Sequence, residues 1–384
     1  MRRRFLAGLT GLAFLACSQD RVADPEVTAE SVAPEAGGEF SIVKTPAYEF
    51  SASIATDGTN FLVSYLSTST VIVKARTVSA GAVLGPQLST GRLGDWPLLA
   101  FDGTNYLMVW RDIQDVAQPN LRGLFVSTTG AKVGAMFAIT GSDDISALNG
   151  LAFGGGQYLV TFKRQDGLLY RRFISPAGAL GTVRLVSAQT GESIIFSNLA
   201  TDGTDFLAVW VGGSNGQSTM ARLILGDGSL GPLVTVSQTA AETAVAPGVA
   251  FNGGQYLAVW QDEVAANEEA VYGRLVTAAG VVNGGRIRIA GSSGVHRTSG
   301  RVVPSGANFA VEYIEGSNTN QTIKLRFVDA AGAVTGSEKT LFTYQNGKRP
   351  YLGPILANGS AFFLVVNRLE LDYDVRGKFQ TLTP

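Results

Sequence analysis

The sequence has almost none of the residues on which most metal sites and nucleophilic enzymes depend. Its 384 residues include one cysteine, Cys17, and one histidine, His296. A single cysteine excludes disulfides within the chain, and a single histidine excludes most zinc sites and most histidine-dependent catalytic groups. No serine or cysteine stands in a recognisable nucleophile setting, so we interpret His296 as an exposed loop residue. We therefore predict no bound metal and no cofactor, and we assign no catalytic residue.

The sequence also lacks an excess of positive charge. It carries 30 basic and 31 acidic residues, and its one arginine run, Arg2 to Arg4, lies at the extreme N-terminus. Without a basic surface there is no electrostatic footprint for DNA or RNA, so we expect no nucleic-acid partner. What the sequence does contain is 47 glycines and 45% hydrophobic residues. This composition indicates a compact, mostly β protein with many tight turns.

One short segment recurs along the chain. It consists of an apolar run, an Asp-Gly-like turn and an aromatic-rich run, and its turn glycine returns every 45 to 53 residues. Such a period is typical of repeat architectures. The seven copies are Ala55 to Tyr65, Ala100 to Trp110, Ala152 to Phe162, Ala200 to Trp210, Ala250 to Trp260, Val303 to Tyr313 and Leu356 to Val366.

Each repeat has room for four strands, and its aromatic-rich strand is apolar on both faces. In the clearest copy, Tyr106 and Trp110 point to one face while Leu107 and Val109 point to the other. Both faces must be covered, which adjacent sheets in a ring would do. We therefore predict an all-β fold, a seven-bladed β-propeller of four-stranded antiparallel blades that start near residues 48, 95, 147, 195, 245, 299 and 351.

The two ends of the propeller region, predicted at residues 39–384, favour a closed ring over a linear β-solenoid. The last repeat supplies only three strands before Pro384, whereas Phe40 to Lys44 resembles the fourth strands of other repeats. Pairing this N-terminal strand with the last blade removes the exposed edges that an open array would leave. We therefore expect the N-terminal strand to complete the last blade.

The N-terminal segment has the charged-then-apolar pattern of an export signal. Arg2 to Arg4 precede the apolar run Phe5 to Ala16, which is too short to span a bilayer comfortably. The sequence Phe14-Leu15-Ala16-Cys17 resembles the lipobox of bacterial lipoproteins. That resemblance implies a signal peptide at 1–16, a lipidated Cys17, a disordered tether at 17–38 and a lipid-anchored protein of the bacterial cell envelope, on the outer membrane. The alternatives are a plain secretory peptide or a buried cysteine.

The repeat itself resembles the Ala-x-Asp-Gly-x-x-Tyr-Leu-Val-Val-Trp type found in exported proteins of environmental bacteria. The resemblance covers Glu39 to Pro384. The diagnostic residues of WD, integrin-type calcium-binding, sialidase and Kelch repeats are missing or incomplete. No activity carries over from those families.

Function in a repeat fold usually lies where the repeats differ. The variable loops follow the second strand of each repeat or join one repeat to the next, and they should share one face of the ring. The opposite face carries mostly Ala, Gly, Ser and Thr turns. Trp96 lies outside the register of Trp110, so it could be a stacking platform, or it could plug the centre of the ring. We predict ligand-binding residues at Trp96, Arg111, Arg297, Arg349 and Tyr351.

Two functions from different classes fit these observations. The first is a monomeric binding or scaffold module for a protein, peptide or glycan, which needs no catalytic group. The second is a glycan-active hydrolase or lyase, which needs a pair of carboxylates near the centre of the ring. The candidate acids are Asp95, Asp143, Glu192 and Glu242. No carboxylate lies in an apolar stretch that would raise its pKa, so we favour the binding module.

Overall fold

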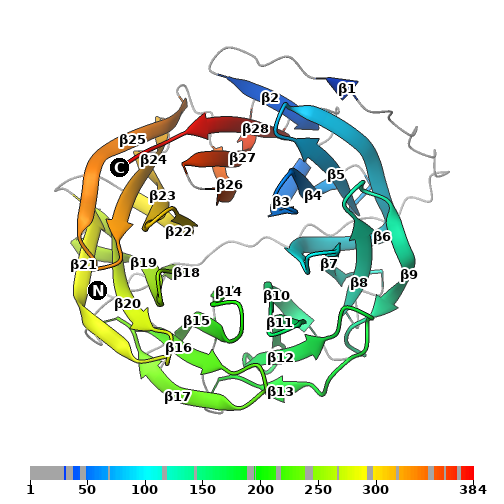
Figure 1. The fold of residues 1–384 in the computed structure, drawn as a ribbon, viewed down its shortest axis with the longest axis horizontal. Helices are drawn as coiled ribbons and strands as arrows, with labels where there is room; N and C mark the ends of the chain where they lie inside the picture. The colour runs from blue at the N-terminus through cyan, green and yellow to red at the C-terminus, as the bar shows by residue number, and fades with distance from the viewer. Residues whose placement is uncertain are drawn as a thin grey trace, which may run out of the picture.

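The protein is a ring of antiparallel β-sheets that surround a common axis (Figure 1). The computed structural model describes residues 30–31, 38–43, 49–67, 70–114, 119–141, 145–187, 194, 196–212, 218–237, 245–265, 268–291, 297–316, 320–344, 350–358, 360–369 and 373–384. Within these ranges the chain forms strands β1 to β28, and it has no helix that is long and apolar enough to cross a membrane. The predicted all-β propeller class is confirmed.

The predicted number of blades was wrong, because five separate four-stranded blades are present instead of seven. Three of them follow one another along the chain. The first contains β10 (Ile145–Gly154), β11 (Gln157–Arg164), β12 (Leu169–Ile174) and β13 (Arg184–Leu185). The second contains β14 (Ser197–Thr201), β15 (Phe206–Gly212), β16 (Ser218–Ile224) and β17 (Leu230–Thr235). The third contains β18 (Val245–Asn252), β19 (Gln255–Ala265), β20 (Glu268–Thr277) and β21 (Val282–Ala290).

The other two blades end the chain. One contains β22 (Arg297–Ser305), β23 (Asn308–Gly316), β24 (Gln321–Asp329) and β25 (Val334–Tyr344). The other contains β26 (Pro350–Asn358), β27 (Ala361–Leu369) and β28 (Tyr373–Thr381), together with β2 (Glu39–Val43).

The remaining strands form one eight-stranded sheet where two of the predicted blades would lie. Its strands are β1 (Glu30–Ser31), β3 (Glu49–Thr56), β4 (Asn60–Ser67), β5 (Ile72–Ser79), β6 (Val83–Phe101), β7 (Asn105–Asp112), β8 (Asn120–Ser127) and β9 (Lys132–Ala138).

Strand β6 joins the two halves of this sheet because it runs unbroken past the predicted boundary near residue 95. Its first part pairs with β5 and its second part pairs with β7. At the junction, Gly94 N donates to Val71 O at 3.0 Å. A Cβ at Gly94 would lie 2.4 Å from Trp110 Cδ1, so glycine lets the chain pass directly over the Trp110 ring without leaving the strand.

The predicted closure by the N-terminal strand is confirmed. β2 pairs antiparallel with β28, so the beginning and the end of the propeller lie side by side (Figure 1). Phe40 and Ile42 are each only 1% exposed. The Phe40 ring lies 6.3 Å from that of Phe363 and 5.6 Å from that of Phe379, close to parallel with both. The ring is therefore closed by backbone pairing and by a stack of aromatic rings.

The recurring aromatic residues form the core, as their repetition predicted. Trp110, Trp210 and Trp260 are fully buried on the aromatic-rich strands of their repeats, β7, β15 and β19. The turn acids also have the predicted structural role. Asp102 Oδ1 accepts hydrogen bonds from the backbone N–H groups of Thr104 and Asn105, each at 2.7 Å. These bonds fix the hairpin turn and occupy one carboxylate oxygen.

A recurring basic residue, which the sequence analysis missed, ties adjacent sheets together. Arg222 on β16 donates through Nη1 to Val186 O of the preceding sheet, at 3.0 Å, and through Nε to Gly231 O of its own sheet, at 2.9 Å. Charge-assisted bonds to buried carbonyls are stronger than neutral ones. The same bond to the preceding sheet is made by Arg76, Arg172, Arg274 and Lys378.

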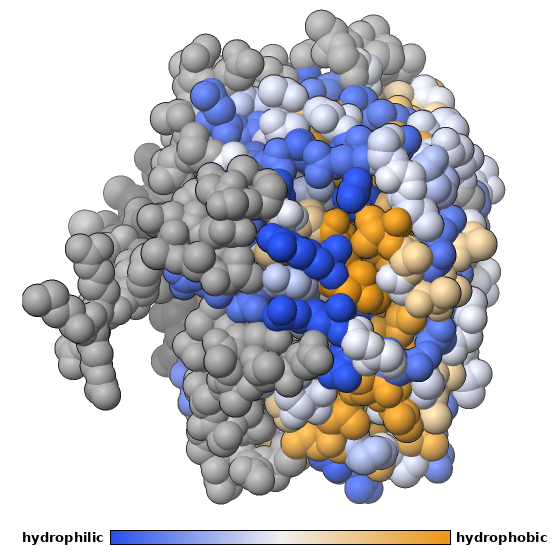
Figure 2. All heavy atoms as spheres, turned by 90° about the vertical axis from the view of Figure 1, so that its left-hand side faces the viewer, coloured by the Kyte–Doolittle hydropathy of each residue, from blue (hydrophilic) through white to orange (hydrophobic). Residues whose placement is uncertain are grey.

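The outer wall of the ring is amphipathic. Seen from the side on which β21 and β25 lie, apolar side chains form a band among hydrophilic ones (Figure 2). β21 accordingly exposes most of its first seven residues, and Val281 in the turn before it is 54% exposed. A single exposed valine is ordinary on a protein surface, so this wall suggests no site by itself.

Candidate functional site

The predicted stacking residue Trp96 lies in a β-bulge of β6, where this strand begins to pair with β7. The register of β6 against β7 shifts between Asp95 and Leu98, and Trp96 has a φ of 48°. This left-handed conformation is costly for a bulky residue and is often found at ligand sites. The side chain is 41% exposed, which is unusual for tryptophan in a protein whose other tryptophans are fully buried. Trp96 is therefore held outward on the surface.

Arg111 orders the Trp96 ring. Its guanidinium carbon lies 4.4 Å from the centroid of the Trp96 ring. The same guanidinium binds the Asp95 carboxylate through two bonds, Nε to Oδ1 at 2.8 Å and Nη2 to Oδ2 at 2.5 Å. The cation therefore lies between an acid and an aromatic face, which fixes the orientation of both. The structure brings two predicted ligand-binding residues together, with Arg111 supporting Trp96.

A second ion cluster stiffens the strand end next to Arg111. Asp112 is 2% exposed and accepts bonds from Arg92 Nη2 at 2.7 Å and from Arg122 Nε. Burial alone would raise the pKa of the Asp112 carboxyl, but bonds from Gln114 N, Arg92 and Arg122 lower it below its ordinary value. Asp112 therefore stays ionised and anchors the end of β7.

Of the other predicted ligand-binding residues, only Arg297 has a described side chain, and it does not join this cluster. Arg297 is 6% exposed, and its Nη2 lies 2.6 Å from Glu315 Oε2, so it serves an internal ion pair. Tyr351 contributes backbone to β26, but its side chain lies outside the described residues. Cys17 and Arg349 also lie outside them.

One of the four candidate acids, Asp95, falls within the described residues. Its two oxygens accept bonds from Nε and Nη2 of Arg111, so its carboxylate serves an ion pair that orients Arg111. Asp143, Glu192 and Glu242 lie outside the described residues, as does His296. The part of the chain that is described contains no group of three His, Cys, Asp or Glu side chains placed to hold a metal ion.

Phe196 is a second exposed aromatic residue, and the sequence analysis missed it. It is 47% exposed and lies just before β14, the innermost strand of its sheet. Its carbonyl accepts a bond from Val211 N at 3.0 Å, so it occupies the position of Asp95 opposite Arg111. The sequence feature that could have identified Phe196 is its position just before the repeat that starts at Ala200, outside the packing register of Trp210. Trp96 and Phe196 therefore lie at the same end of two innermost strands.

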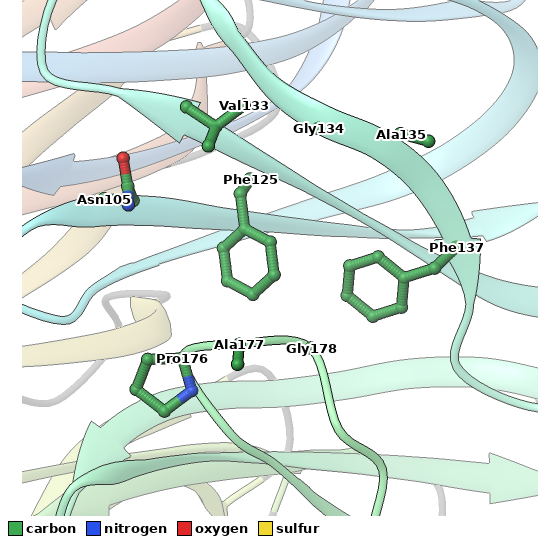
Figure 3. A pocket seen from close by; sticks show the side chains of 9 residues that line it. All are labelled: Asn105, Phe125, Val133, Gly134, Ala135, Phe137, Pro176, Ala177 and Gly178. Carbon is green, nitrogen blue, oxygen red and sulfur yellow. The ribbon is translucent and has the colours of Figure 1, made fainter.

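A pocket of about 440 Å³ lies between the sheet that ends in β9 and the blade β10–β13. The rings of Phe125 and Phe137 stand side by side over Pro176 and Ala177 (Figure 3). Their centroids are 5.6 Å apart. Asn105, which lies against this pocket, begins β7, whereas Arg111 lies near its end, so about 20 Å separates the pocket from the Trp96 cluster. The face expected to carry mostly small turn residues therefore borders an apolar pocket.

The comparisons with known proteins show the fold. No protein-family model matches the chain, and no curated protein matches it. Among solved structures, the chain is similar to a PL25 polysaccharide lyase, an ulvan lyase. The TM-score is 0.63 at 9% identity, over 93% of this chain and 96% of the lyase.

Two further solved structures are similar. One is the BP39L lectin from Burkholderia pseudomallei, with a TM-score of 0.63 at 13% identity over 88% of this chain and 97% of the lectin. The other is the β-propeller domain of the Trilobed protease from Pyrococcus furiosus. It has a TM-score of 0.54 at 8% identity over 88% of this chain and 98% of that domain. At these identities the likeness shows a shared propeller fold alone.

Proposed function

We propose that the protein is a carbohydrate-binding β-propeller in which Trp96 is the main stacking platform. The observation that supports this proposal is an indole that is 41% exposed, held in a strained bulge and ordered by Arg111. Sugar rings present flat faces of C–H groups that pack against aromatic rings, while their hydroxyls bind nearby polar groups. Phe196 offers a second aromatic surface at the same end of the ring.

A glycan is favoured over a protein partner because the two aromatic side chains that are exposed among the described residues lie on different sheets, Trp96 on β6 and Phe196 beside β14. The same propeller architecture serves a lectin and a polysaccharide lyase. Binding is favoured over catalysis because the described acid at this site, Asp95, is committed to its ion pair with Arg111. The proposal therefore requires no catalytic residue.

Replacing Trp96 by alanine should weaken glycan binding by about tenfold, on the order of 1.4 kcal/mol, because aromatic anchors dominate such contacts. The fold should survive, because Ala246 adopts the same φ of 48° at a bulge of β18 and, like Trp96, precedes a proline. Binding to immobilised glycans, measured for the wild type and Trp96→Ala, checks the expectation.

Val281→Ala is the control, since Val281 is 54% exposed on the outer wall and far from the Trp96 bulge in the chain. It should bind glycans as the wild type does. Undiminished binding by a folded Trp96→Ala variant would contradict the role of Trp96, and a wild type that binds no glycan would contradict the function.

We also propose that the propeller is tethered to a bacterial membrane through Cys17, on the basis of the lipobox-like sequence Phe14-Leu15-Ala16-Cys17. Two or more acyl chains suffice for stable anchoring. Cells fed a fatty-acid analogue should label the wild type and not Cys17→Ser, and the variant should leave the membrane fraction. Equal labelling of both proteins would refute lipidation at this residue.

A further inference from the structure

One arginine breaks the pattern that the third strands share. Arg171 on β12 pairs with Thr161 on β11 and with Arg184 on β13. Elsewhere in the ring, the residue at this register position is small or apolar: Ala75, Gly123, Ala221, Gly273, Leu325 and Gly377. The glycines leave room for a large fourth-strand side chain; a Cβ at Gly123 would lie 2.7 Å from Phe137 Cζ. In β12 and β13, two cations replace this packing.

The two arginines face each other without a neutralising partner of their own. Like charges directly opposite on paired strands destabilise a sheet. Arg171 is 2% exposed, and its Nε is buried without a hydrogen-bond partner. Its Nη2 donates to Gly228 O of the next blade. Burial lowers the pKa of the Arg171 guanidinium, and the charges of Arg184 and Arg222 lower it further.

These arginines line a pocket of about 300 Å³ between the blades β10–β13 and β14–β17. Arg184 is exposed there, and among the described residues it makes no hydrogen bond or ion pair. The pocket also offers Thr182, whose hydroxyl suits an oxyanion. The lining residues are Arg171, Phe173, Thr182, Arg184, Asp227, Gly228 and Ser229.

One carboxylate oxygen of the single acid in the pocket is already bonded within its own turn. Asp227 Oδ1 accepts bonds from Ser229 N and Ser229 Oγ, each at 2.7 Å. Its attraction favours the charged form of Arg171, but it forms no hydrogen bond to either arginine in the described structure. Two positive charges against one negative charge leave the pocket with a net positive charge.

The pocket lined by Phe125 and Phe137 has the same construction as the Arg171–Arg184 pocket but carries no arginine. Phe125 and Phe173 occupy the same position in the two pockets, as do the turn glycines Gly178 and Gly228. Phe137 in the first pocket is replaced by Arg184 in the second. One pocket is therefore apolar and aromatic, whereas the other is cationic.

We propose that the Arg171–Arg184 pocket binds an anionic substituent of a glycan, a carboxylate or a sulfate. This inference rests on the proposed carbohydrate binding and specifies the charge of the ligand. A guanidinium offers paired N–H donors that match the oxygens of either group. The anion would offset the repulsion between Arg171 and Arg184. A polymeric glycan could occupy both this pocket and the Trp96 platform, which lie at opposite ends of the strands.

Three dextrans with one backbone test the proposal and identify the anion: dextran sulfate, carboxymethyl dextran and unsubstituted dextran. The wild type should bind at least one charged polymer more tightly than dextran itself. Arg184→Gln should weaken that binding about tenfold, the loss expected for a charged hydrogen bond. The stronger of the two charged polymers would show whether the site prefers sulfate or carboxylate.

Lys339→Gln is the matched control, because Lys339 occupies the same fourth-strand register opposite Leu325 and its loss changes the net charge equally. It should leave binding of the charged polymers within about twofold of the wild type. Equal losses in Arg184→Gln and Lys339→Gln, or charged polymers bound no better than dextran, would overturn the proposal.

Inorganic sulfate tests anion binding in the pocket independently of carbohydrate binding. Sulfate should raise the melting temperature of the wild type more than that of Arg171→Ala, compared at equal ionic strength in chloride. Alanine is tolerated at this register, as Ala75 and Ala221 show. Equal sulfate shifts would overturn the anion site. A sulfate shift that depends on Arg171, in a protein that binds none of the three polymers, would keep the anion pocket and refute its role in carbohydrate binding.

Discussion

Replacing Phe40 by alanine should lower the free energy of unfolding by about 3–5 kcal/mol, the usual cost of emptying a buried phenylalanine site. Phe40 is 1% exposed, and its ring packs against those of Phe363 and Phe379. It also lies over Gly377, where a Cβ would be 2.8 Å from Phe40 Cζ. Denaturant unfolding of the wild type and Phe40→Ala measures the difference directly.

Phe137→Ala is the matched control for this prediction. Phe137 lies over Gly123 in the same register as Phe40 over Gly377, but it is only partly buried and lies within one continuous chain segment. Its loss should cost less than that of Phe40. An equal or larger loss for Phe137→Ala would contradict a special contribution of the closing strand.

Deleting residues 39–43 should have a further effect that Phe40→Ala lacks. It removes β2 from β28 and exposes the N–H and C=O groups of an unpaired edge. The shortened protein should associate through that edge, and light scattering or sedimentation would detect the oligomers. A shortened protein that stayed monomeric and melted at the wild-type temperature would show that β2 does not close the ring.

The second large effect concerns pH and the buried acid Glu312. It lies on β23 at the position that Val109, Val209 and Val259 occupy on other second strands, and it is 1% exposed. Burial raises the pKa of the Glu312 carboxyl to about 8, although the nearby Arg301 guanidinium acts to lower it. Its Oε2 has no hydrogen-bond partner. Arg301 pairs with Glu312 across the strands and is exposed on the innermost strand β22.

Whether the protein gains or loses stability with pH follows from the pKa of Glu312 in the unfolded and the folded states. In the unfolded chain Glu312 titrates near its ordinary value of 4.5, whereas in the folded protein it keeps its proton up to about pH 8. Between these values the folded state binds more protons, so the free energy of unfolding should fall as the pH rises. The slope is at most about 1.4 kcal/mol per pH unit, and the total loss is on the order of 5 kcal/mol.

Glu312→Val tests this effect with the residue that the other sheets use. Well below pH 4.5 Glu312 is protonated in both states, so the variant and the wild type should respond similarly to pH there, whereas at pH 8 the variant should be the more stable. Thermal unfolding across this range measures both curves. Parallel curves for the two proteins would show that Glu312 does not titrate within it.

The sequence alone determined the features that depend on local pattern. The recurring Asp-Gly turns and the apolar second strands predicted a propeller, because alternation and turn chemistry are read within a few residues. The burial of Trp110, Trp210 and Trp260 followed from their identical placement in the repeats. The pairing of Phe40 with the last sheet was also predictable, because the last repeat lacked one strand.

The tertiary structure alone decided what depends on contacts between distant segments. The repeat spacing predicted seven blades, but the passage of Gly94 over Trp110 keeps β6 continuous and leaves five separate blades. The support of Trp96 by Arg111 and the facing pair Arg171 and Arg184 needed three-dimensional register. A repeat pattern specifies how each residue packs within its own sheet. Charge and exposure depend on the neighbouring strands and sheets, whose side chains are not repeated.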